Sequence, residues 1–181
     1  PEMRFRSGGV TLTSLCMLLL RAAEAGKMSL DDPLSNWLPE LPDSQQVTLR
    51  MLANCTAGYP DYVPIEAFHQ QFYANVFREW SDAELIAIAL EQPRPYPPGA
   101  GWNYSHTNFL ILGKVLEKIY KRPLPELFHS ELIRPLGLQS SFFATNPALP
   151  LPNLHAYSHD RGVYEDSTFW NPSWTGASGR L

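Results

Sequence analysis

The side chains most suited to acid–base chemistry are those of Tyr104 and His106, which flank a single serine. A phenol has a pKa of about 10 and acts as a base only when neighbouring groups lower that value. A histidine just before an expected helix can instead satisfy backbone groups at the helix start. We therefore expect Tyr104 to be a buried tyrosine that holds a hydrogen bond, with proton transfer as the alternative.

The usual spacings of a hydroxyl nucleophile and its base are absent from the sequence. None of the four lysines has a serine three residues before it, so the chain contains no Ser-x-x-Lys pattern. There is also no Gly-x-Ser-x-Gly elbow, and Ser178 lacks the flanking spacing that such an elbow requires.

His155, His159 and Asp160 could be imagined as metal ligands if they lay on one helix. Prolines and a glycine around them favour a loop, and no third ligand is evident. We expect solvated histidines, with no metal site and no cofactor.

Residues 5–12 read Phe-Arg-Ser-Gly-Gly-Val-Thr-Leu. This stretch resembles the Phe-Arg-x-Gly-Ser-x-x-Lys opening of the penicillin-recognising serine hydrolases, the family of class C β-lactamases, DD-peptidases and related esterases. Gly9 stands at the position of the serine and Leu12 at that of the lysine. Tyr104-Ser105-His106 resembles the family's second motif, Tyr-x-Asn, with His106 at the position of the asparagine. The third motif, Lys-Thr-Gly or His-x-Gly, is absent.

Further blocks resemble the same family in order along nearly all 181 residues. They are 24–33, 37–42, 47–52, 56–62, 98–108, 134–138 and 169–174.

The resemblance implies an α+β fold of the β-lactamase/transpeptidase type, in which a helical part pairs with an antiparallel sheet formed from both termini. The chain begins at Pro1 and stops at Leu181, just after a segment that leads into further structure in the family. We therefore expect residues 1–181 to form one partial domain, truncated at both ends. It should be mainly helical with few short strands, lack most of the sheet and expose apolar surface.

Length and composition agree with one globular domain. The chain is 44% hydrophobic, carries a net charge of -4 and has no basic run, which argues against nucleic acid or anionic lipid as a partner. No apolar segment is long enough to span a membrane. Cys16 and Cys55 lack motif spacing and are expected to be buried thiols. No feature specifies an oligomeric state.

The apolar run at 10–20 follows Arg4 and Arg6 and precedes Ala-Glu-Ala, which is also the pattern of a secretory signal peptide. Arg21 and Glu24 directly after the run favour a core helix instead. An extracytoplasmic location is implied by the resemblance alone.

Hydrophobic periodicity, capping residues and prolines predict the helices and loops. We expect a helix ending at Gly26, a helix opened by the capping box Ser81 and Glu84, and a helix ended by Pro123. A short helix should begin at Thr48. The predicted helices are 11–25, 32–38, 81–92, 107–121 and 124–133, with an extended loop at 91–101. From 139 onward, short apolar pieces such as 141–144 alternate with Pro, Asn, Asp and Gly, which predicts loops with one or two short strands.

In the family, the first-motif serine attacks a carbonyl while the lysine and the second-motif tyrosine manage its proton. Gly9 has no side chain to attack with, and loss of a serine nucleophile costs on the order of 10⁶ in rate. Its backbone N–H at a helix start could still bind a carbonyl or an anion. Aromatic residues beside the motifs could line a ligand groove or be ordinary core residues: Tyr59, Tyr62, Trp102, Trp170 and Trp174.

Three hypotheses follow from the sequence. The first is a non-catalytic or impaired family member that binds small-molecule, peptide-like, ester-like or peptidoglycan-like ligands. The second is an active esterase, β-lactamase or D-Ala-D-Ala carboxypeptidase with a non-standard nucleophile. The third is an incomplete fragment without independent function, which would unfold without cooperativity.

Overall fold

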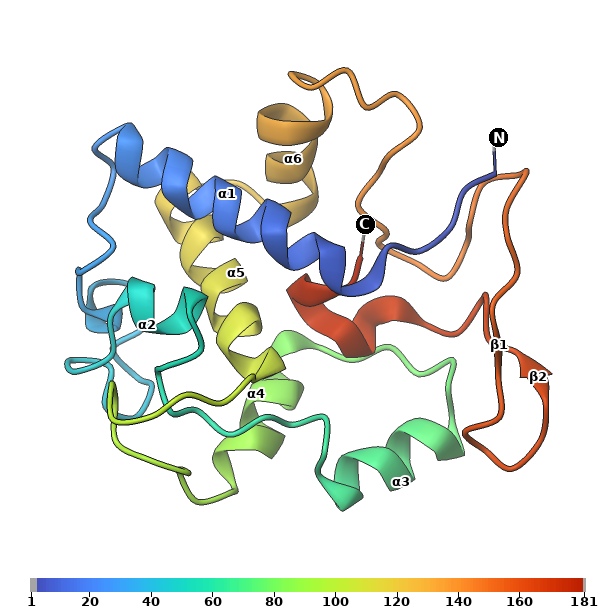
Figure 1. Ribbon diagram of the computed structural model, residues 1–181, viewed down its shortest axis with the longest axis horizontal. Helices are drawn as coiled ribbons and strands as arrows, with labels where there is room; N and C mark the ends of the chain where they lie inside the picture. The colour runs from blue at the N-terminus through green and yellow to red at the C-terminus, as the bar shows by residue number, and fades with distance from the viewer. Residues whose placement is uncertain (1–2, 181) are drawn as a thin grey trace.

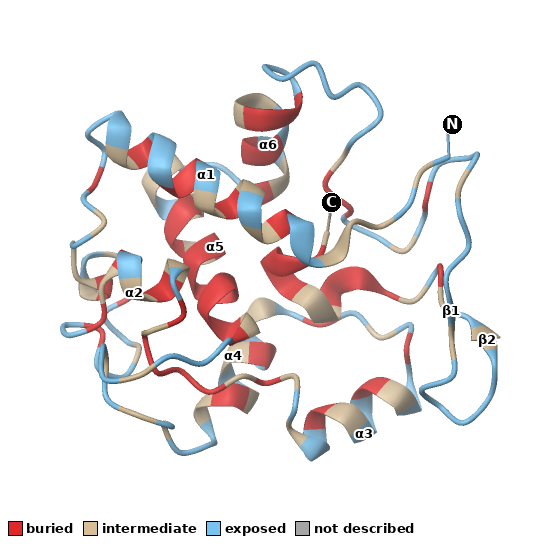
Figure 2. Cartoon of the chain, in the orientation of Figure 1, coloured by how far each residue is buried: buried red, intermediate tan, exposed pale blue. Residues whose placement is uncertain are grey.

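Helix α5 (His106–Tyr120) runs through the centre of the molecule, and most other elements pack around it (Figure 1). This computed structural model describes residues 3–180. The elements that contact α5 are α1 (Thr11–Glu24), α2 (Leu49–Ala53), α4 (Asp82–Leu90), α6 (Leu124–Phe128) and the C-terminal 3₁₀ segment η4 (Pro172–Ser178). Figure 2 shows that α5 is buried along most of its length. The remaining helical elements are η1 (Gly8–Val10), η2 (Leu34–Asn36), α3 (Glu66–Ala74) and the π-helical η3 (His129–Ile133).

Apolar side chains form two adjoining cores. The larger one joins α1, α5 and α6 through fully buried residues such as Leu15, Leu112 and Leu127. The smaller one, here called the aromatic cluster, contains Tyr62, Phe68, Phe72 and Trp80, and Trp170 and Trp174 pack against it. The aromatic cluster therefore fastens α3 to the rest of the molecule.

The predicted helices are confirmed where capping or periodicity marked them. Helix α1 begins at Thr11, and α5 ends at Tyr120 shortly before Pro123. The Ser81–Glu84 capping box is complete, and the Thr48 hydroxyl accepts the Met51 N–H at 3.3 Å to open α2.

The prediction of a short helix at 32–38 is wrong. The segment forms only the single turn η2, because Pro33 precedes the turn in an extended conformation. The prediction of one or two short strands after residue 139 is confirmed by β1 (Tyr157–Ser158) and β2 (Glu165–Asp166), an antiparallel pair in which Tyr157 faces Asp166. The apolar piece 141–144 belongs to neither strand, and its Phe143 packs on Phe128 with ring centroids 4.8 Å apart.

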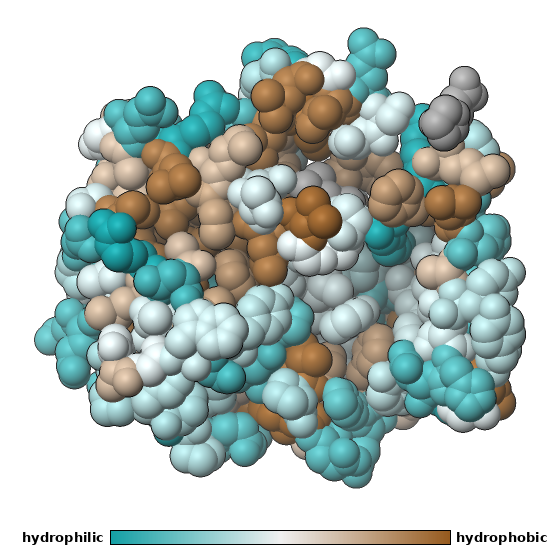
Figure 3. Space-filling model, in the orientation of Figure 1, coloured by the Kyte–Doolittle hydropathy of each residue, from teal (hydrophilic) through white to brown (hydrophobic). Residues whose placement is uncertain are grey.

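Apolar side chains are exposed over α1 and around α6, as the family resemblance predicted (Figure 3). The exposed residues include Phe5, Val10, Met17, Leu20, Leu136 and Leu138. Within residues 3–180, no helix has the length and apolar character needed to cross a membrane.

Candidate functional site

Gly9 and Leu12 lie at the N-terminal end of α1, where the short turn η1 leads into the helix. Gly9 is exposed, and a Cβ built on it would meet no heavy atom within 4 Å. Its φ also lies outside the left-handed region, so neither space nor backbone conformation requires a glycine here. Leu12 is half-buried and lines an apolar depression with Cys16, Ala53 and Phe109.

Tyr104 lies near Phe109, which in turn lies beside Leu12. The Tyr104 and Phe109 ring centroids are 6.0 Å apart, and Phe109 lines the same depression as Leu12. The fold thus brings the first-motif and second-motif positions, far apart in sequence, onto one region of the surface.

The expectation that Tyr104 is buried and hydrogen-bonded is wrong. Its side chain is 38% exposed, and it makes no hydrogen bond to any residue in the described part of the chain. It lies in the loop before α5, and its ring meets His106 edge-on at 4.9 Å. Partial burial, followed by the nearby Asp61 and Cys55, raises the pKa of the Tyr104 phenol. A raised pKa keeps the phenol protonated and makes it a poorer base at neutral pH.

His106 is held by Asp61, a residue that sequence inspection did not single out. The His106 Nδ1 lies 3.0 Å from Oδ2 of Asp61, and the His106 backbone N–H donates to Oδ1 of the same carboxylate at 3.2 Å. Asp61 therefore caps the first turn of α5 and orients the His106 ring. The two residues are 45 positions apart, so no local pattern could have paired them.

The structure corrects the expectation that Tyr59 and Tyr62 line a ligand groove. Tyr59 is 1% exposed and Tyr62 is 0% exposed. Their hydroxyls donate to the carbonyls of Pro42 at 2.7 Å and Trp174 at 2.8 Å. Burial raises the pKa of Tyr59 to about 12, which fits a neutral structural phenol.

The three tryptophans that were expected to line a groove lie in different surroundings. Trp102 is 68% exposed in the loop before Tyr104. Trp170 and Trp174 pack on Phe72, with ring centroids 5.8 Å and 5.1 Å away, and belong to the edge of the aromatic cluster. Of the five aromatic residues, Trp102 is the most exposed.

The remaining candidate groups are His155 and the two cysteines. Nδ1 of His155 lies 2.6 Å from Oδ2 of Asp166. Cys16 and Cys55 are free thiols, Cys16 half-buried and Cys55 buried. Within residues 3–180 no three His, Cys, Asp or Glu side chains are grouped as metal ligands.

The geometry around Gly9 offers binding groups more readily than catalytic ones. The nearest hydroxyl on α1, that of Thr11, is buried and donates to the Gly8 carbonyl at 2.8 Å. Leu12 supplies no cation, and Tyr104 has a raised pKa. The exposed backbone at the start of α1 can still present N–H groups to a carbonyl or an anion.

The sequence is similar to a known protein family over nearly its whole length. A family model described as Beta-lactamase matches residues 1–180. Esterase EstB of Burkholderia gladioli is 27% identical over 152 residues, which cover 78% of this chain and 38% of that protein.

Two solved structures share the fold of nearly the whole chain. A D-stereospecific amidohydrolase from Streptomyces sp. has a TM-score of 0.92 and 34% identity over 98% of this chain and 56% of its own. D-amino acid amidase from Ochrobactrum anthropi SV3, in a complex with L-phenylalanine, has a TM-score of 0.83 and 25% identity over 97% of this chain and 50% of its own. The chain thus spans about half the length of these relatives, and less of the curated esterase.

Proposed function

Because this chain belongs to the Beta-lactamase family of penicillin-binding proteins, esterases, D-aminopeptidases and DD-carboxypeptidases, we propose that it binds peptide-like or ester-like ligands without turning them over. The observation that carries this proposal is the pair Gly9 and Leu12 at the start of α1. By the family resemblance, these two residues stand at the positions of the nucleophile and the lysine, and neither side chain can serve as a nucleophile or a base.

The surroundings of Tyr104 support the same conclusion. A tyrosine acts as a base at neutral pH when its surroundings, such as a nearby cation, lower its pKa. Here the Asp61 carboxylate lies nearby and, after burial, is the next largest cause of the raised Tyr104 pKa. Tyr104 is therefore suited to contact a ligand with its ring and to donate a hydrogen bond from its hydroxyl.

The proposed ligand class is an amide or ester of a D-amino acid. The structural relatives include a D-stereospecific amidohydrolase and a D-amino acid amidase. In this chain the carbonyl of such a ligand would meet the N-terminal turn of α1, and its side chain would lie against Tyr104 or Trp102. We further propose that residues 1–181 form a single, partial family domain.

Incubation with D-phenylalanine amide tests this function. We expect saturable binding in ligand-observed NMR, with no ammonia release above that of buffer alone. Tyr104→Ala should weaken binding by about tenfold, as expected for loss of one aromatic contact and one hydrogen bond. Tyr164→Ala, at a 75% exposed position on the distant hairpin, is the matched control and should bind as the unaltered chain does. Ammonia release, or a lack of binding by a cooperatively folded sample, would contradict the proposal.

A further inference from the structure

Two exposed aromatic rings lie where the proposed function places the side chain of the ligand. The side chain of Tyr104 is 38% exposed, and that of Trp102, two residues earlier in the same loop, is 68% exposed. The face of an aromatic ring carries partial negative charge and attracts a cation. This part of the site therefore favours a cationic group over an anionic one.

Asp61 adds a full negative charge close to Tyr104. Its carboxylate accepts the backbone N–H groups of Val63 and His106, each at 3.2 Å, and these donors stabilise the ionised form. The Asp61 side chain is only 10% exposed, so water and salt screen its charge weakly. Burial and then the charge of Asp61 raise the pKa of Tyr104, which shows that the field of this carboxylate reaches the phenol.

Asp61 has no lysine or arginine partner in the described part of the chain. The one side chain at ion-pair distance from it there is His106, whose Nδ1 lies 3.0 Å from Oδ2. A neutral imidazole already meets this contact, because its Nδ1–H can donate to the carboxylate. The pair therefore carries a net negative charge whenever His106 is neutral.

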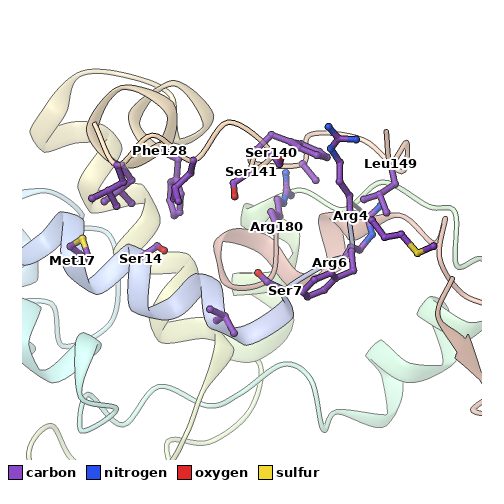
Figure 4. A pocket seen from close by; sticks show the side chains of 18 residues that line it. Arg4, Arg6, Ser7, Ser14, Met17, Phe128, Ser140, Ser141, Leu149 and Arg180 are labelled. Carbon is purple, nitrogen blue, oxygen red and sulfur yellow. The ribbon is translucent and has the colours of Figure 1, made fainter. Parts of the chain in front are cut away.

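The arginines near the start of α1 do not offset the charge at Tyr104. Figure 4 shows Arg4, Arg6 and Arg180 around a groove beside α1, and neither Asp61 nor Tyr104 lines that groove. Within the described residues, no lysine or arginine is among the causes that shift the pKa of Tyr104. The surroundings of the Tyr104 ring are thus complementary to a positive charge.

A depression of about 530 Å³ adjoins the same loop at Asn103, and its volume is in the range of small-molecule sites. Its polar lining consists of the carboxylates of Asp61 and Glu66 and the amides of Gln92 and Asn103. Among the residues that the structure describes, no lysine or arginine lines it. Glu66 is exposed, and its Oε1 accepts the Gln70 side-chain amide at 3.0 Å. The depression therefore offers space and negative charge to the end of a side chain that crosses Tyr104.

We propose that the ligand of this site is a D-amino acid amide or ester with a cationic side chain and that Asp61 determines this preference, which rests on the binding function proposed above. The aliphatic part of a lysine-like side chain would pack on the Tyr104 ring, with its ammonium group toward Asp61 and Glu66. A cationic side chain gains from the ring and from the carboxylates. A neutral side chain gains only from packing, and an anionic one is repelled.

Three ligands that differ in side-chain charge test the preference: D-lysine amide, D-norleucine amide and the α-amide of D-glutamate. Ligand-observed NMR titrations are made at low salt and about pH 8, above the usual range of histidine and below that of a lysine side chain. D-lysine amide should bind at least about tenfold more tightly than D-norleucine amide, from a cation–π contact and an ion pair together. The glutamate amide should bind most weakly, and high salt should reduce the differences.

Asp61→Asn removes the charge but keeps an oxygen that can accept the two backbone N–H groups. The preference for D-lysine amide over D-norleucine amide should fall to about threefold or less, which the aromatic ring and Glu66 can supply. The pKa of Tyr104, followed by NMR of labelled tyrosine, should fall as well, which a purely structural role of Asp61 does not predict. Asp160→Asn removes the same charge from the exposed hairpin turn and is the matched control, with an unaltered preference.

The comparison of the three ligands uses the unaltered chain, so it needs no variant to fold. Equal affinity for the lysine and norleucine amides would overturn the cationic preference and leave the proposed binding function standing. An unchanged preference in a folded Asp61→Asn variant would overturn the role of Asp61. If a cooperatively folded sample bound none of the three ligands, the proposed function itself would be contradicted, and the preference with it.

Discussion

Gly9→Ser combined with Leu12→Lys is expected to create a serine that reacts with a fluorophosphonate. Gly9 lies in η1 and Leu12 in the first turn of α1, three residues further on, and no heavy atom lies within 4 Å of a Cβ built on Gly9. A lysine at position 12 would lie against Phe109, Cys16 and Ala53, and apolar surroundings lower a lysine pKa. A neutral lysine can take the serine proton. Covalent labelling, followed by intact mass, should proceed at least about a hundredfold faster than in the unaltered chain.

The matched control for this double variant is Gly9→Ser with Leu12→Met. It carries the hydroxyl but keeps an apolar side chain at position 12, so its labelling should stay close to background. Equal labelling of the two double variants would show that position 12 does not act as the base. Lack of labelling in both, with unchanged folding, would contradict the placement of the site at the start of α1.

Gly176→Ala is expected to destabilise the fold by about 3–5 kcal/mol, a large share of the stability of a typical domain. Gly176 has φ 53° and ψ -132°, a conformation that residues with a Cβ rarely adopt. A Cβ there would lie 1.7 Å from Cδ2 of Leu110, which is fully buried in α5. Both backbone strain and a steric clash therefore oppose the substitution. Urea unfolding followed by circular dichroism measures the loss.

Gly162→Ala separates the cost of backbone strain from the cost of the steric clash. Gly162 also has a positive φ, of 78°, but nothing lies within 4 Å of its added Cβ. Its replacement should cost only about 1 kcal/mol, from backbone strain alone. If Gly176→Ala lowered the free energy of unfolding no more than Gly162→Ala does, the close packing of η4 against α5 would be contradicted.

The helices that sequence predicted well are those with local signals at their ends. The capping box at Ser81 and the proline after α5 act through neighbouring residues, so they can be read without knowing the fold. Helix α3 was not predicted, because its stability comes from Phe68 and Phe72 packing into the aromatic cluster. Their spacing of four residues was the one local signal for that helix.

The site was predictable only in part, for a related reason. Motif order identified the family fold, and it made Gly9, Leu12 and Tyr104 candidate site positions. Whether an aromatic side chain near a motif is buried depends on distant segments, as with Tyr62, whose hydroxyl reaches the carbonyl of Trp174. The Asp61–His106 pair likewise joins residues far apart in sequence.

The measurement that tests the central claim most directly is the intact mass of the unaltered chain after incubation with a fluorophosphonate and, separately, with a fluorescent β-lactam. A sample that unfolds cooperatively should keep its unmodified mass with both probes, because Gly9 supplies no nucleophile. A covalent adduct of either probe, mapped by peptide sequencing to a serine or threonine near the start of α1, would contradict the claim that this family member binds without catalysis.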